Sequence, residues 1–295
     1  MNQSPEANTV LVPAGQRIFN PTRLALTLLA ALAVVIILFP FAWIVLSSFR
    51  DPEHFLSLDW RDSIPHRISI MSYVLALRRA DLFLWLRNSM LVALSTTVLS
   101  LAVAAPLAFA LSHIQFRGQR PTSALLSIHY AIPSITIAVP LFVILVAIHF
   151  YDSLPALVLV HTSLTIPFAT WVLRDFYHSI PHELVEAGFV DGASLTRVLR
   201  YVILPLSVPA LLAAGAYAFI LSWNDFLFAL VLMNSAVRFT APVGIHAFFT
   251  GRNIEQSLWA QLMAASTLVS LPSAILFGIF QRYLVSGFLS GAVKG

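Results

Sequence analysis

The sequence EAGFVDGA at residues 186–193, followed by VILP at residues 202–205, forms a polar island between two long apolar segments. A chain as hydrophobic as this one offers few places where a soluble partner can bind. The island combines two acidic side chains with small residues that permit close approach, and its proline can begin a new membrane helix. The stretch therefore predicts a membrane protein that carries a binding surface for a soluble partner.

The composition places the whole chain in the membrane class. Of its 295 residues, 59% are hydrophobic and only 10% are charged, whereas about 25% of the residues of a soluble domain are charged. There is no cysteine, which excludes disulfides, thiolate metal sites and cysteine nucleophiles. The only lysine, Lys294, does not stand in a G-K-[ST] sequence, so the chain has no P-loop for ATP hydrolysis. Its scattered arginines do not suggest a nucleic-acid partner.

Six runs free of charged residues predict six membrane-spanning helices, since a bilayer helix needs about 20 residues. Prolines stand at or within several of these runs, and membrane helices tolerate proline where neighbouring helices satisfy the freed carbonyl groups. This favours one packed helical bundle over residues 21–295. The first span is too long for a signal-peptide core, so no cleavage is expected. The expected spans cover about residues 24–49, 88–112, 122–150, 154–173, 205–233 and 257–281.

The orientation of the bundle is only weakly determined by charge. An even number of spans places both termini on one side, and the arginines divide almost evenly between the two sides. The positive-inside rule therefore favours a cytoplasmic N-terminus only slightly. Residues 1–20 are expected to form a disordered cytoplasmic tail. In the long outer loop over residues 50–87, Arg78 and Arg79 either anchor an interfacial helix or contact a soluble binding protein.

Around the island, local signals predict two short helices. Pro181 and Glu183 suit the first turn of a helix that runs to about residue 189, because proline is tolerated there and acids favour the positive end of the helix dipole. Gly192 then permits a turn, and Ser194 can cap a second helix over residues 194–201. The two helices would form a knob at the membrane edge. Without further information, an ordinary amphipathic connecting loop remains the alternative.

The island resembles the signature of the permease subunits of bacterial ABC importers. That signature reads E-A-A, three residues, G, nine residues, then I-x-L-P, and residues 186–188, Gly192 and residues 202–205 match its spacing. Two positions depart from it: Gly188 replaces the second alanine, and Val202 replaces isoleucine. The first change is expected to loosen the first short helix.

Four other segments are similar to the carbohydrate-importer branch, which includes the second permease of the maltose transporter. They are NS at 88–89, IPHEL at 180–184, SWNDF at 222–226 and SGFLSGAVKG at 286–295. The resemblance extends over roughly residues 20–295. It implies an all-α integral membrane protein with six transmembrane helices and the type I importer permease fold, also called MetI-like. It also implies a bacterial cytoplasmic (inner) membrane location, with residues 175–204 and both termini in the cytoplasm.

The resemblance further implies a transport subunit of an ATP-driven importer for a sugar or sugar-like solute. The expected partners are a second, homologous permease, two copies of an ATPase, an extracytoplasmic solute-binding protein and the lipid bilayer. ATP and Mg²⁺ would bind to the ATPase, and no cofactor or metal is expected on this chain. A contact between Lys294 in the C-terminal tail and the ATPase is also expected. The residues expected to dock on the ATPase are Glu183, Glu186, Ala187, Gly188, Asp191, Gly192 and Ala193.

Asp225 is the only acid within a predicted span. A charged side chain at mid-bilayer costs about 2.5–3.5 kcal/mol on insertion scales, so it is a candidate functional residue. Together with Trp223 and Asn224 it supplies a carboxylate, an indole face and an amide, which suit a sugar pathway. The alternative is structural, with these side chains holding helices together by hydrogen bonds. The sequence leaves both interpretations open.

Three histidines, His129, His149 and His161, lie in or near spans without the paired spacing of a metal site. Neutral, packed imidazoles are the preferred interpretation. Two other classes of protein compete with the ABC permease. An ion-driven secondary transporter would show internal repeats, and an intramembrane enzyme would show an active-site constellation. The sequence contains neither signal.

Overall fold

The computed structural model describes residues 21–52, 55, 68–79, 81–250 and 256–292. Its described residues form helices and no strands. The expected tail over residues 1–20 and the expected contact residue Lys294 lie outside the described part. Helix α1 (Pro21–Ser48) continues past Pro40 and is apolar on all sides, as expected of a membrane span. Residues up to 44 form one compact unit and residues from 45 onward form another.

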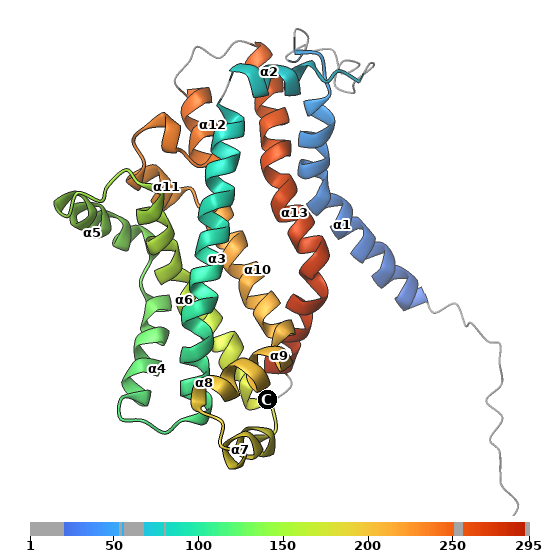
Figure 1. The fold of residues 1–295 in the computed structure, drawn as a ribbon. Helices are drawn as coiled ribbons and strands as arrows, with labels where there is room; N and C mark the ends of the chain where they lie inside the picture. Colours follow the sequence, from blue (N-terminus) through green and yellow to red (C-terminus); the bar gives the residue numbers. More distant parts are fainter. Residues whose placement is uncertain (1–20, 53–54, 56–67, 80, 251–255, 293–295) are drawn as a thin grey trace, which may run out of the picture. The chain divides into compact units, whose positions relative to one another are not determined.

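Three helices form the centre of the second unit. Helices α3 (Leu82–His113), α6 (Leu154–His178) and α10 (Val208–Asn224) pack on one another, and α13 (Gln256–Ala292) packs against α10 and α2 (Met71–Arg79) (Figure 1). Small side chains line this interface, since Ala104 and Ala108 of α3, Ala169 of α6 and Ala214 of α10 are all fully buried. Membrane helices associate through such close backbone approaches because the surrounding lipid is as apolar as leucine.

The predicted span over residues 122–150 is not one helix. It consists of α4 (Gln119–Ile128), a short 3₁₀ turn (His129–Ala131) and α5 (Ser134–Ala147). Pro133 explains the break: the residue before a proline is pushed out of the helical region, and Ile132 is extended at φ −97° and ψ 117°. The expected span is therefore built from two helices joined by a short turn.

The predicted fifth span, residues 205–233, is also interrupted. The chain runs through α7 (His182–Val190), α8 (Leu195–Val198), one turn of π-helix (Leu199–Ile203) and α9 (Leu204–Leu206). It then bends by 83° into α10, which ends at Asn224 and is followed by α11 (Leu227–Leu232). A 3₁₀ turn (Ala236–Arg238) and α12 (Ala241–Thr250) complete the described chain before α13.

Within the described part, four helices are long and apolar enough to cross a membrane, and the bent pair ending in α10 makes a possible fifth. The remaining expected span is the interrupted segment from α4 to α5. At one end of α6 lies the docking segment, defined here as residues 181–206. At the other end, the loop before α6 meets the loop after α11 (Figure 1), and we call that end the clasp end.

Candidate functional site

The docking segment has the two short helices that the sequence predicted. Helix α7 begins after Pro181, carries Glu183 in its first turn and ends at Val190, one residue beyond the expected end. Gly192 has a positive φ of 76°, a backbone conformation that glycine adopts without steric cost. The turn is closed by backbone bonds, including one of 3.0 Å from the Ala193 N–H to the Gly188 carbonyl.

The second helix differs from the prediction in how it begins and ends. Ser194 stands at its N-cap position, but its side chain makes no capping bond and lies 3.2 Å from the Thr196 hydroxyl instead. The helical backbone also continues through the π-turn and α9 up to the 83° bend. The docking segment is therefore joined to α10 by helical backbone, with the bend at Ser207 between them.

Gly188 permits a close approach between the two short helices. A Cβ added there would lie 3.2 Å from the Val198 Cγ2, tighter than ordinary van der Waals contact. The sequence predicted that Gly188 loosens the first helix, and the structure adds that it makes room for Val198 of α8.

The docking segment presents a mixed acidic and apolar face. Most of the predicted docking residues are exposed, and Gly188 and Ala193 are half-buried. Sequence reasoning missed the apolar side chains among them: Leu184, Phe189, Val190 and Leu195 are exposed, and Val190 is 87% exposed. The signal that could have found them is their position within the matched signature and directly beside it.

The opposite face of the segment holds it on the bundle through apolar contacts. Val185, Val198 and Ile203 are buried together with Leu173 and Tyr177 of α6. Burying a side chain of this size contributes roughly 1.5–3 kcal/mol. The exposed apolar side chains have no such cover within the described chain, and exposed apolar surface of this kind marks an interaction site.

The SWNDF segment lies where α10 ends, and its tryptophan is a packing residue. Trp223 is 1% exposed, donates from Nε1 to the Val269 carbonyl of α13 at 3.0 Å and stacks on Phe219 with ring centroids 5.7 Å apart. No face of its indole is open to a sugar in this conformation. Asn224 is exposed, and the Ser273 hydroxyl donates to its Oδ1 over 3.4 Å.

Asp225 has partners that the sequence did not reveal. Its carboxylate accepts from the backbone N–H of Phe228 at 3.4 Å and of Ala229 at 2.9 Å, which caps α11. Its Oδ2 lies 3.1 Å from Nε2 of His161, a fully buried residue of α6. Trp223 and Asp225 thus hold helices together, while the amide of Asn224 remains accessible. No signal in one sequence pairs His161 with Asp225, because their proximity depends on how α6 packs against α10 and α11.

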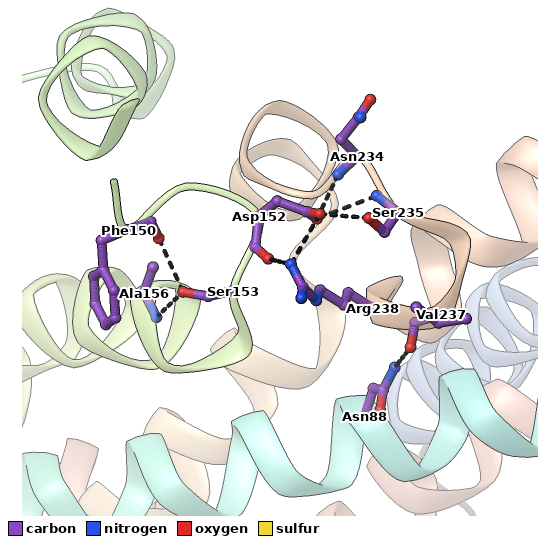
Figure 2. Close-up of polar contacts among 9 residues, drawn as sticks. All are labelled: Asn88, Phe150, Asp152, Ser153, Ala156, Asn234, Ser235, Val237 and Arg238. Carbon is purple, nitrogen blue, oxygen red and sulfur yellow. Dashed lines mark hydrogen bonds and ion pairs between the residues drawn. The ribbon is translucent and has the colours of Figure 1, made fainter. Parts of the chain in front are cut away.

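A polar clasp joins two loops at the clasp end (Figure 2). Asp152 accepts from the backbone N–H of Asn234 at 2.9 Å and of Ser235 at 3.1 Å, and from the Ser235 hydroxyl at 2.5 Å. Arg238 donates to the same carboxylate at 3.1 Å and to the Asp152 carbonyl. Burial raises the pKa of Asp152, but the bonds from Ser235 and Asn234 and the charge of Arg238 outweigh it, so the pKa lies below its ordinary value.

The NS pair at residues 88–89 holds the same loop from the side of α3. Asn88 donates to the carbonyl of Val237 at 2.9 Å (Figure 2) and to the carbonyl of Phe239 at 3.0 Å. The Ser89 hydroxyl accepts from the N–H of Ala241 at 2.8 Å. The loop between α11 and α12 is therefore fixed by side chains of α3 and by the loop before α6.

The described residues contain no group of three or more histidine, aspartate or glutamate side chains that could hold a metal ion. His161 belongs to the contact with Asp225. His149 stands in the turn before α6 with a positive φ of 56°.

Comparison with known proteins identifies the family. Residues 101–289 match the family described as binding-protein-dependent transport system inner membrane component. The chain is 32% identical to the trehalose/maltose transport system permease protein MalG of Thermococcus litoralis, over 92% of this chain and 97% of that one. It is 30% identical to the diacetylchitobiose uptake system permease protein DasC of Streptomyces coelicolor, over 88% and 92%.

A solved structure has the same fold. A chain of a bacterial ABC transporter that imports the acidic polysaccharide alginate superposes with a TM-score of 0.79 at 20% identity, covering 92% of this chain and 99% of that one. The match confirms the expected type I importer permease fold. The chain therefore belongs to the binding-protein-dependent transport system inner membrane components, the permease subunits of ABC importers.

Proposed function

We propose that this chain is one half of the pore of an importer that carries a sugar or sugar-like solute across the bacterial cytoplasmic membrane. The class of solute rests on the relatives, whose names include trehalose/maltose and diacetylchitobiose transport. A second, homologous permease would complete the pore, and an extracytoplasmic binding protein would deliver the solute. ATP and Mg²⁺ would bind to a pair of ATPase subunits and not to this chain.

The docking segment carries this proposal. It offers an acidic face through Glu183, Glu186 and Asp191 together with an apolar patch around Val190, and both are exposed. An ATPase cleft with basic and apolar groups would complement it. Ala187, Gly188, Gly192 and Ala193 keep the segment thin enough to enter such a cleft. Movement of the ATPase would then reach the pore through the helical backbone leading into α10.

In this arrangement the docking segment and both termini lie in the cytoplasm, and the clasp end faces outward. Lys294 at the C-terminal end would add a further contact with the ATPase. On the pathway, the accessible Asn224 is the best candidate among Trp223, Asn224 and Asp225 for touching solute, because its amide is exposed at the end of α10.

The docking proposal is tested by placing a charge on the exposed apolar patch. Val190→Arg should abolish co-purification of the ATPase without unfolding the chain, because the Val190 side chain is almost fully exposed. The matched control is Val237→Arg, since Val237 is also a largely exposed valine, at the clasp end. The control should retain the ATPase. Normal ATPase recovery with Val190→Arg would contradict the assignment of this surface.

The solute class is tested separately on the assembled transporter. A panel of mono- and disaccharides is screened for binding to the cognate binding protein. Each ligand is then tested for stimulation of ATP hydrolysis in the reconstituted complex. Stimulation by no carbohydrate, with stimulation by another class of solute, would overturn the sugar assignment while leaving the docking proposal intact.

A further inference from the structure

One imidazole contacts both sides of the break between α10 and α11. The break consists of Asp225 and Phe226. On one side of it, Nδ1 of His161 lies 2.8 Å from the hydroxyl of Ser222, in the last turn of α10. On the other side, Nε2 lies 3.1 Å from Asp225 Oδ2, the carboxylate that caps α11.

The contacts of this imidazole reach a further helix. The Ser222 hydroxyl beside Nδ1 also contacts the Thr96 hydroxyl of α3, over 3.5 Å. On the opposite edge of the ring, Nε2 faces a carboxylate oxygen, which can only accept. An N–H on Nε2 makes this contact attractive, and a neutral imidazole can supply it while Nδ1 accepts from Ser222.

Because both side chains are largely buried, loss of the contact between His161 and Asp225 would be destabilising. The His161 side chain is fully buried and the Asp225 side chain is 11% exposed. Removing one partner of a buried pair leaves the other without compensation for its lost hydration. The buried Nε2 atom makes no aligned hydrogen bond, and the polar group that the structure places beside it is Asp225 Oδ2, at 3.1 Å.

The position of the pair along the chain suggests what it does. The docking segment leads through a bend into α10, and the loop after α11 is fixed by Asp152 and Asn88. If α10 moves with the docking segment while that loop stays fixed, the two-residue break between α10 and α11 must absorb the difference. His161 on α6 bridges this point.

We propose that His161 and Asp225 are positioning residues of transport, which align α11 with α6 at the break while α10 moves. The proposal rests on the proposed function, because it requires that the docking segment be driven by an ATPase. It assigns no solute contact to either residue. Loss of the pair should uncouple transport from ATP hydrolysis while the complex still assembles.

The test uses the reconstituted complex and conservative variants. Asp225→Asn keeps an acceptor oxygen for capping α11, and His161→Asn keeps a donor near Ser222. Each should lower the solute transported per ATP hydrolysed by about tenfold or more, with complex yield close to that of the unmodified protein. The double variant should be no worse than either single variant, because residues that act through one contact are not additive. Ser163→Ala is the matched control and should leave the ratio unchanged, because Ser163 lies on α6 near His161 and its hydroxyl donates to the Val160 carbonyl of the same helix.

The outcomes separate this proposal from the docking proposal. Co-purification of the ATPase with both variants tests docking, and the transport-to-hydrolysis ratio tests the pair. An unchanged ratio, or additive losses in the double variant, would overturn the positioning role. Should both Asn variants assemble poorly, the exchanged variant His161→Asp with Asp225→His decides. If this exchanged variant restores both assembly and the amount of solute transported per ATP, the two residues act as one unit. If it restores assembly alone, or restores neither, the positioning role is refuted.

Discussion

The two ends of α6 are built from different interactions. At the clasp end, loops are joined by a carboxylate, an arginine and an asparagine that satisfy backbone groups across more than 80 residues of sequence. At the docking end, the short helices rest on the bundle through buried Val185, Val198 and Ile203 and expose other apolar side chains. Polar bonds need defined geometry, whereas apolar contacts allow sliding. The difference suggests that the clasp end stays in place, and that a partner covers the exposed apolar side chains of the docking end.

The largest expected effect breaks the docking end. Gly192→Trp should reduce uptake to background and lose the ATPase on purification, because a bulky side chain would block insertion of the segment into the ATPase cleft. The substitution also strains a backbone position with φ of 76°. The control is Gly192→Asn, since asparagine tolerates this conformation better than most residues, and it should retain much of the uptake. Normal uptake by Gly192→Trp would contradict the proposal that the docking end binds a partner and the clasp end does not.

The next effect breaks the clasp end. Asp152→Ala leaves two backbone N–H groups and the Ser235 hydroxyl without their acceptor, and should lower the free energy of unfolding by roughly 2 kcal/mol. Arg238→Ala removes a half-exposed ion pair and should cost only about 0.5 kcal/mol. Denaturant unfolding of the purified complex in detergent measures both. Equal costs for the two variants would show that the carboxylate acts mainly through Arg238.

A pH series sharpens the same point. Because the pKa of folded Asp152 is lowered, its stabilising contribution is present above the ordinary aspartate pKa of about 3.9 and is lost as pH falls through the lower folded value. We therefore compare the melting temperatures of the unmodified protein and of Asp152→Asn at about pH 5 and about pH 7. The difference between them should be the same at both pH values and should shrink below about pH 4. A difference that shrinks already near neutral pH would implicate another group.

The smallest expected effect is measured as chemical labelling of single cysteines, with no change in activity. The chain has no cysteine, so single cysteines report topology without background. Ser194→Cys in the docking segment should be protected from an impermeant reagent in intact cells, and Val237→Cys at the clasp end should react. Val237 is preferred to Ser235 because the Ser235 hydroxyl is engaged by Asp152. Reaction at residue 194 alone would invert the orientation of both ends.

Much of the fold could be predicted because local chemistry specifies it. Charge-free runs locate apolar helices. The start of α7 directly after Pro181 and the turn at Gly192 follow from residues that favour these conformations. Two details were not predicted, and each has a physical cause. Pro133 separates α4 from α5 within the expected third span. The Ser194 hydroxyl contacts the Thr196 hydroxyl and makes no capping bond to a backbone N–H of α8.

The sequence by itself determined the class of molecule, the family and the place of the docking segment, because composition and short-range spacing carry that information. Only the tertiary structure decided what Asp225, Asn88 and Asp152 do. Each contacts residues that lie from 64 to more than 150 positions away in the sequence. A single sequence does not show which of its distant residues meet in the folded protein. Packing of α3, α6 and α10 brings them together, and turns an isolated intramembrane acid into one member of a buried pair.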